Sequence, residues 1–320
     1  MTAAAADSTH LASRRRLVTA VIALAAVTVI WGSTFSLTKD LLTRISVTDY
    51  LALRFLTAAA VVALVRPWVV LRLDRRTVKV GASLGVLYCL GQALQFFGLP
   101  HTSATVSAFV VSMYVVFTPL LAATLLRSRP DRSTVVAVVL ATGGVATMSL
   151  RGWALGFGEL LTLAAAALYA AHILALSRWS TARTAYPLTL VQLLTMGACF
   201  LIWTSFDGVQ GPGRGDLLAF LYLSVVAGAV ALLVQTWAQA HVGSAQAAVL
   251  MVLEPVWAAF FGFALWHESV DARTLIGGGL VLASMVLVVL RPSGSQAAAG
   301  AAEAAGVGAV VIPEEPDGRA

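Results

Sequence analysis

The chain has 320 residues, of which 59% are hydrophobic and only 11% are charged, with a formal net charge of +6. A soluble domain of ordinary composition carries about 25% charged residues, so this composition excludes that class and indicates a polytopic membrane protein. The two cysteines, Cys89 and Cys199, lie inside apolar stretches with no metal-binding spacing around them, and we interpret them as packing residues.

Apolar segments follow one another along the chain, each close to the ~20 residues that a membrane-spanning helix needs. Arg14 to Arg16 precede the first segment, which is too long for a secretory leader and is therefore interpreted as a span. We predict ten spans, at residues 17–38, 48–66, 78–98, 103–126, 134–150, 157–177, 185–205, 217–239, 243–267 and 273–290. Residues 1–16 form an amino-terminal tail, and residues 1–13 and 292–320 are expected to be disordered.

The basic residues lie mostly in alternate loops. With the amino terminus in the cytoplasm, fifteen lysine and arginine residues fall inside and five outside, which leaves Arg54 within a span. The positive-inside rule therefore predicts that both termini are cytoplasmic, in the plasma membrane. Because the excess charge is explained by the loops, no nucleic-acid partner is expected.

The two halves of the chain are weakly alike. A shift of 141 residues lays the segment from Ser103 on the segment from Ser244, and a shift of 138 lays Trp31 on Tyr169 and Arg54 on Gln192. Five spans in each half is an odd number, so the second half enters the membrane in the opposite sense. Inverted repeats of this kind are typical of transporters, with the substrate site at the repeat interface.

Short motifs in a fixed order carry a family resemblance. They are Trp31-Gly32-Ser33-Thr34-Phe35, Leu53-Arg54-Phe55, Thr102-Ser103-Ala104, Gly158-Glu159-Leu160, Gly243-Ser244-Ala245 and Leu253-Glu254-Pro255-Val256. With these motifs the chain resembles the EamA family of the drug/metabolite transporter superfamily. The resemblance implies an all-α membrane protein of ten helices in two inverted five-helix repeats, at residues 17–150 and 151–291. The first half departs from it, with Met113-Tyr114 where the second has Glu254-Pro255.

Two charged residues inside spans are the main candidates for function. Arg54 cannot neutralise itself by losing a proton, so it either contacts an anion or carboxylate in a cavity or forms a structural pair near the interface. Glu254 either carries a proton as the cavity changes sides or accepts hydrogen bonds at a helix kinked by Pro255. Glu159 and Glu268, at span ends, are assigned to interface or capping positions.

Uncharged polar and aromatic residues complete the candidate site. Gln92 with Gln95 and Gln235 with Gln239 are spaced to share a helix face, and either line the cavity or bond between helices. Aromatic residues such as Trp257 wall the cavity or belong to the core, and His172 is a titrating group or a core histidine. The predicted substrate-binding residues are Trp31, Ser33, Thr34, Arg54, Gln92, Gln95, Tyr114, Tyr169, His172, Gln192, Gln235 and Glu254.

The resemblance implies a secondary active transporter, most often an exporter, of a small amino-acid-like or drug-like metabolite by alternating access. The chain has no nucleotide-binding loop, and we expect no enzyme activity, no cofactor and no metal. The expected partners are the solute, protons and membrane lipid. Small residues in the fifth and tenth spans, Ala137 with Ala141 and Gly279 with Ala283, permit close helix packing or a homodimer contact. The alternative is a membrane-embedded lipid-modifying enzyme.

Overall fold

The computed structural model describes residues 3–125, 132–151, 154–181, 183–206, 208–239, 241 and 250–290. The predicted carboxyl-terminal tail and the start of the ninth predicted span, with its Gly243-Ser244-Ala245 motif, lie outside the described residues. The first half contains α1 (Ala3–Leu41), α2 (Val47–Val65), α3 (Pro67–Val70), α4 (Arg75–Gly98), η1 (Leu99–His101), α5 (Ala104–Val111), α6 (Tyr114–Leu125) and α7 (Arg132–Ser149).

The second half repeats this order of long helices. It contains α8 (Phe157–Trp179), α9 (Ala185–Thr204), η2 (Arg214–Asp216), α10 (Leu217–Leu221), η3 (Tyr222–Val230), α11 (Ala231–Gln239), α13 (Leu253–Trp266) and α14 (Ala272–Leu290). Between the halves, β1 (Leu150–Arg151) pairs with β2 (Ala154–Leu155) as a two-residue antiparallel ribbon. Among the described residues the regular structure is helical apart from this link.

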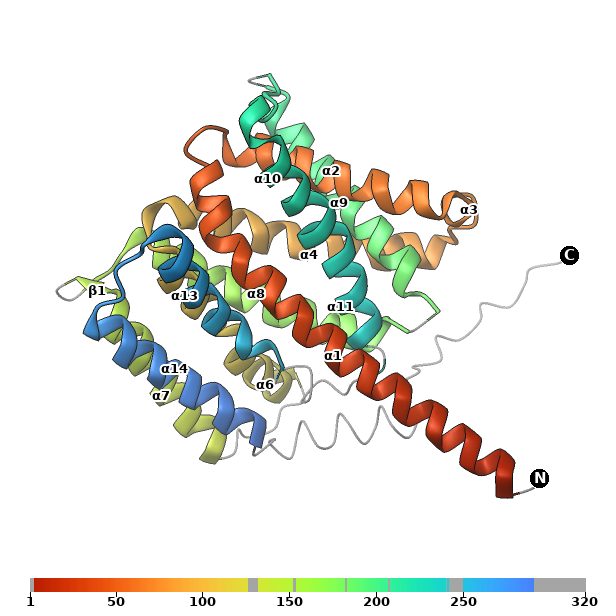
Figure 1. The fold of residues 1–320 in the computed structure, drawn as a ribbon, viewed down its shortest axis with the longest axis horizontal. Helices are drawn as coiled ribbons and strands as arrows, with labels where there is room; N and C mark the ends of the chain where they lie inside the picture. The colour runs from red at the N-terminus through yellow and green to blue at the C-terminus, as the bar shows by residue number, and fades with distance from the viewer. Residues whose placement is uncertain are drawn as a thin grey trace, which may run out of the picture.

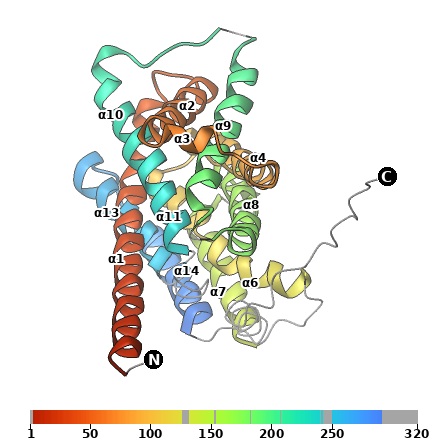
Figure 2. The same cartoon turned by 90° about the vertical axis from the view of Figure 1, so that its right-hand side faces the viewer.

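Seven helices of the described chain are long and apolar enough to cross a membrane, and three shorter apolar helices lie at residues 135–148, 253–266 and 272–287. The first helix differs from its prediction, because α1 begins at Ala3 rather than at residue 17. Residues 3–13, which we expected to be disordered, are therefore helical. The amino-terminal turns of α1 extend past the other helices (Figures 1 and 2).

Side-chain contacts at helix ends establish the direction of each helix. Thr204, at the end of α9, donates to Asp49 at the start of α2, and Arg44, just after α1, pairs with Asp216 just before α10. Thr102, between α4 and α5, donates to Glu159 at the start of α8. We call this the Glu268 end of the bundle. At the opposite end, which we call the Arg66 end, Arg66 after α2 stacks on Tyr186 at the start of α9.

Corresponding helices of the two halves therefore run in opposite senses. The helices α1, α4 and α9 end at the Glu268 end, where α2, α5, α8 and α10 begin. The helix contacts follow the same relation, in which α1 corresponds to α8, α4 to α11 and α6 to α13. The contact of α4 with α8 is matched by that of α11 with α1, and the contact of α6 with α8 by that of α13 with α1. The structure is thus an inverted repeat.

Close helix packing at the flank of the bundle joins α7 to α14, which lie side by side in Figure 1. A Cβ atom added to Gly144 would lie 2.6 Å from the carbonyl oxygen of Gly277, so these helices meet at bare backbone. Ala137 and Ala141 are fully buried, whereas nothing lies within 4 Å of a Cβ added to Gly279. The small residues of the fifth predicted span therefore pack inward, and Gly279 does not serve this helix contact.

Breaks in two helices were not predicted. The fourth predicted span is interrupted at Ser112 and Met113, between α5 and α6, and the ninth is interrupted at Val252, just before α13. Pro255 therefore stands at the third position of α13, where an amide N–H would have no helical partner. The helix is thus interrupted three residues before Pro255, within the turn whose hydrogen bond a proline at this position cannot donate.

Candidate functional site

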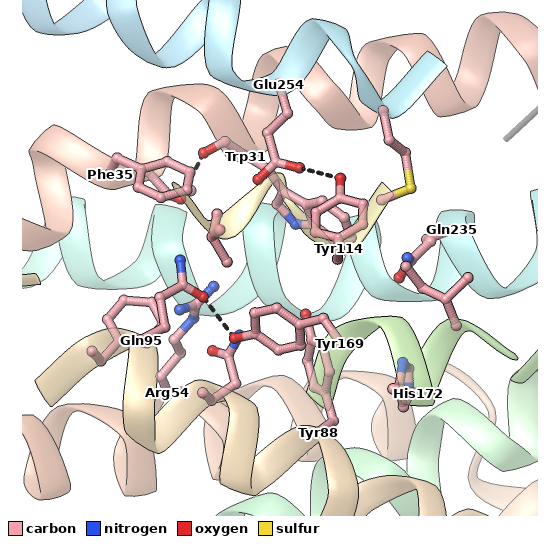
Figure 3. Close-up of a pocket in the computed structure, with 16 residues that line it drawn as sticks. Trp31, Phe35, Arg54, Tyr88, Gln95, Tyr114, Tyr169, His172, Gln235 and Glu254 are labelled. Carbon is pink, nitrogen blue, oxygen red and sulfur yellow. Dashed lines mark hydrogen bonds between the residues drawn. The ribbon is translucent and has the colours of Figure 1, made fainter. Parts of the chain in front are cut away.

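A cavity lies where the two halves meet, lined by residues of α1, α2, α4, α5 and α6 from the first half and of α8, α11 and α13 from the second (Figure 3). Its volume is about 60 Å³. This space holds a few water molecules, whereas cavities for small-molecule ligands measure ~300–1,000 Å³. The lining residues are Trp31, Thr34, Phe35, Arg54, Tyr88, Gln92, Gln95, Phe96, Val111, Tyr114, Tyr169, His172, Ile173, Gln235, Met251 and Glu254.

Arg54 is buried in the wall that α2 contributes, with 6% of its surface exposed. Its Nε donates to the carbonyl oxygen of Leu223 at 3.1 Å, and its guanidinium lies 5.5–5.6 Å from the ring centres of three aromatic residues. Leu223 belongs to the π-helical segment η3, a geometry that is frequent at functional sites. The Nη1 atom has no hydrogen-bond partner, and Arg54 forms no ion pair within the described part of the chain.

Glu254 lies on the other side of the cavity from Arg54 (Figure 3). It is the second residue of α13 and is buried, and its Oε2 accepts a hydrogen bond of 3.1 Å from the hydroxyl of Tyr114. A carboxylate in the first turn of a helix is stabilised by the helix dipole. Tyr114 is itself the first residue of α6, so both helix breaks deliver a functional group to the cavity. Broken helices at the repeat interface are where transporters of this architecture bind their substrates.

A polar network joins α4 to α8 across the cavity. The hydroxyl of Tyr169 donates to Gln95 Oε1 at 2.6 Å and accepts from Gln92 Nε2 at 2.7 Å. The ring of Tyr88 lies 5.2 Å from that of Tyr169. Two buried acceptors, Gln92 Oε1 and Gln235 Oε1, have no partner within the described residues. Since buried polar atoms are nearly always hydrogen-bonded, these oxygens are suited to donors of a bound solute or of water.

Ten of the twelve predicted site residues line the cavity, and two do not. Ser33 faces a separate, apolar groove on the outer side of α1, where its hydroxyl lies 2.7 Å from that of Tyr222. Gln192 is fully buried behind the cavity and bonds His172 Nε2 at 2.8 Å. Trp257, which we expected among the aromatic residues of the wall, instead packs against Phe260 and Phe261.

Sequence reasoning missed six lining residues. Tyr88 was detectable, because Tyr88, Gln92 and Gln95 are spaced to lie on one helix face. The others are apolar residues among many, and no sequence signal separates them from the core: they are Phe35, Phe96, Val111, Ile173 and Met251. Among the described residues, no group of three or more His, Cys, Asp and Glu side chains is arranged to hold a metal ion.

Hydrogen bonds join the two halves at the Glu268 end. Glu268 accepts from the backbone N–H groups of Ala104 at 2.9 Å and Thr105 at 3.1 Å, and from the Thr105 hydroxyl at 2.7 Å. It thus caps the amino end of α5, which agrees with its predicted capping role. Two residues position it. His267 ends α13 in a left-handed conformation with φ of 52°, and a Cβ added to Gly262 would lie 3.0 Å from Glu268 Oε2.

The chain matches the family model described as the EamA-like transporter family twice, at residues 18–150 and 156–290. It is 30% identical over 278 residues to a protein of Archaeoglobus fulgidus named an uncharacterized transporter, with 84% of this chain and 85% of that protein covered. A second uncharacterized transporter of the same organism is 26% identical over 209 residues, covering 62% of this chain and 71% of that protein.

Among solved structures, one crystal structure matches with a TM-score of 0.63 over 85% of this chain and 96% of that chain. The sequence identity is 17%, so this match shows a shared fold alone.

Proposed function

Because this chain belongs to the EamA-like transporter family, we propose that it is a secondary active carrier that exports a small amino-acid-like or drug-like metabolite by alternating access. The family and the named relatives make it a transporter and a multi-pass membrane protein, consistent with the drug/metabolite transporter superfamily. They favour a carrier over the alternative of a lipid-modifying enzyme.

The observation that carries the proposal is the pair of opposite charges in the cavity. Arg54 and Glu254 are buried on opposite sides, and neither forms an ion pair with the other. An unpaired buried charge is costly, so a ligand that brings the opposite charge gains affinity. A zwitterion satisfies both residues at once, with its carboxylate on Arg54 and its ammonium group on Glu254. The surrounding aromatic side chains suit an apolar substituent.

Alternating access explains the small size of the cavity. A site of about 60 Å³ is too small for a metabolite, so the halves have to separate before one enters. At the Glu268 end, separation breaks the three hydrogen bonds between Glu268 and the start of α5. Since α5 and α13 belong to different halves, movement of one half against the other opens this end.

Coupling to protons is assigned to Glu254. A carboxylate can hold either a proton or the ammonium group of a solute, but not both. Exchange of the two at one site links export of the solute to proton entry, which is the driving force of a secondary exporter.

The topology that we propose has ten crossings in the plasma membrane and two cytoplasmic termini. The seven long and three shorter apolar helices supply ten segments, two of them broken at the cavity. The Arg66 end, which is rich in basic residues, then faces the cytoplasm. A homodimer remains a prediction, with Gly279 and Ala283 on an exposed face of α14 available for it.

Purified protein in lipid vesicles tests the function by solute exchange. Vesicles are loaded with a neutral amino acid, and uptake of the labelled amino acid is compared with uptake of its amide, which lacks the carboxylate, and of its deaminated acid, which lacks the ammonium group. We expect the zwitterion to be preferred. Arg54→Gln should reduce the preference for the zwitterion over the amide. Glu254→Gln should reduce the preference for the zwitterion over the deaminated acid. Equal transport of all three solutes, or an unchanged preference in both variants, would contradict the assignment.

A pH gradient tests the coupling in the same vesicles. Wild-type solute flux should rise when protons flow down their gradient in the direction opposite to the solute. The Glu254→Gln variant should still exchange solute, but its flux should not respond to the gradient. An unchanged response in Glu254→Gln would remove the proton role. Chemical conversion of vesicle lipid without any solute flux would instead support the enzyme alternative.

A further inference from the structure

At the Arg66 end, the segment that joins α2 to α4 presents exposed apolar side chains. Trp68 of α3 is 52% exposed, and Leu71, just after α3, is 87% exposed. In Figure 1, α3 lies at the edge of the bundle, between the end of α2 and the start of α4. Large apolar side chains gathered on an exposed segment indicate a surface that is covered by something else.

Basic residues flank these apolar side chains in the sequence. Arg66, Arg72, Arg75, Arg76 and Lys79 are all exposed. We call these five residues, together with Trp68 and Leu71, the α3 surface. The ion pairs of the described chain involve none of these cations.

The single acid of the segment does not neutralise the surface. Asp74 precedes α4 and accepts hydrogen bonds from the backbone N–H and the hydroxyl of Thr77. Arg75 and Arg76 occupy the first turn of α4, where positive charge opposes the helix dipole. Arg75 and Arg76 therefore do not stabilise the helix that carries them, and another partner has to account for their position.

We propose that the α3 surface binds the headgroups of anionic phospholipids in the leaflet that it meets. Tryptophan concentrates at the boundary between acyl chains and headgroups. An exposed leucine beside it is stabilised when its apolar surface is buried at the same boundary. Clusters of four to eight basic residues next to a membrane helix attract anionic lipid. The inference rests on the membrane-spanning part of the proposed function and not on the solute.

Titration of purified full-length protein in a neutral detergent with phosphatidylglycerol tests the proposal, with the rise in melting temperature as the measure of binding. Phosphatidylcholine with the same acyl chains is the lipid control. Arg214→Gln is the matched protein control, because Arg214 is an exposed arginine at the Glu268 end. Arg76→Gln should weaken the apparent affinity roughly fivefold, the factor that one cation near an anionic surface contributes.

The triple variant Arg72→Gln/Arg75→Gln/Arg76→Gln should weaken the affinity roughly a hundredfold. Lysine at the same three positions should retain it, which separates loss of charge from loss of fold. Equal stabilisation by the two lipids, or equal weakening by Arg76→Gln and Arg214→Gln, would overturn the proposal. Because the measurement involves no solute, such a result leaves the transport function untouched.

Discussion

The contact between α1 and α13 predicts the effect of a single added methyl group. A Cβ atom at Gly32 would lie 2.5 Å from the Cβ of Trp257, 2.9 Å from the amide nitrogen of Ala258 and 3.0 Å from the carbonyl oxygen of Glu254. Carbon atoms in favourable contact are ~3.5–4.0 Å apart, so Gly32→Ala requires the helices to move apart by roughly 1 Å. Two of the three neighbours are backbone atoms, which cannot turn away.

Overpacking of this kind costs about 1–3 kcal/mol. An alanine in a helix also gains about 0.5–1 kcal/mol over glycine, which would hide part of this cost. Gly143→Ala is the matched control, because nothing lies within 4 Å of a Cβ added to Gly143 in α7. The helix gain is common to both variants, so their difference in unfolding free energy, about 1–3 kcal/mol, isolates the packing cost.

Reversible unfolding of the purified protein in mixed micelles measures this difference, and solute exchange measures its consequence for transport. Gly32→Ala should be the less stable variant and should also exchange solute more slowly, because α13 carries Glu254 to the cavity. Gly143→Ala should match or exceed the stability of wild type and keep its exchange rate. Equal stability of the two variants would refute the close approach of α1 and α13.

Three further changes follow from individual contacts. Arg54→Lys should weaken binding of the zwitterion about tenfold or more in the exchange assay, because an ammonium group cannot make the paired hydrogen bonds of a guanidinium. Glu268→Gln should speed hydrogen exchange of the Ala104 and Thr105 amides, since bonds to a charged group are each worth about 1.5–3 kcal/mol. The Thr77 backbone N–H and hydroxyl hold the pKa of Asp74 below its usual range. The stabilisation that these bonds provide is complete above the unfolded-state pKa of ~3.9 and is lost as pH falls through the lower pKa of the folded state. Asp74→Ala should therefore lower the melting temperature at pH 7, and the decrease should be smaller at pH 3.

The sequence predicted where the apolar helices lie but not how they are built. Hydropathy separates residues that suit lipid from residues that suit water, and it therefore located the apolar segments and the relation between the halves. The break at Ser112 and Met113 contains neither proline nor glycine, the residues that usually mark interruptions. The bond that the Ser112 hydroxyl donates to the carbonyl oxygen of Ala108 lies at this break, and hydropathy does not reveal it. The π-helical segment at residues 222–230 is equally invisible to hydropathy.

The polar residues of the site could be predicted from the sequence. A buried polar side chain in an apolar span is costly, so Arg54, Glu254 and the glutamines stood out, and each except Gln192 and Gln239 lines the cavity. The direction of a side chain was harder to predict. Ser33 and Thr34 are adjacent, yet they point about 100° apart around the helix, so only Thr34 faces the cavity.

The inverted repeat also explains why the two charges are not duplicated. A shift of 141 residues relates Glu254 and Pro255 to Met113 and Tyr114, and in the structure the hydroxyl of Tyr114 donates to Glu254 itself. Residues near these positions thus meet where the halves join. A second carboxylate there would lie beside Glu254, and two carboxylates sharing an apolar site cannot both be ionised.

The neutral Met113 stands in place of that acid, and the neighbouring phenol of Tyr114 donates a hydrogen bond to Glu254 instead of repelling its charge. Met113-Tyr114 is in this sense the complement of Glu254-Pro255. The same reasoning applies to Arg54, whose counterpart at a shift of 138 is the neutral Gln192. Each charge therefore has a neutral counterpart in the other half, which leaves one cation and one anion in the cavity. A scaffold of two similar halves thereby acquires a dipolar site, and a dipolar site is what distinguishes a zwitterion from solutes that carry only one of its charges.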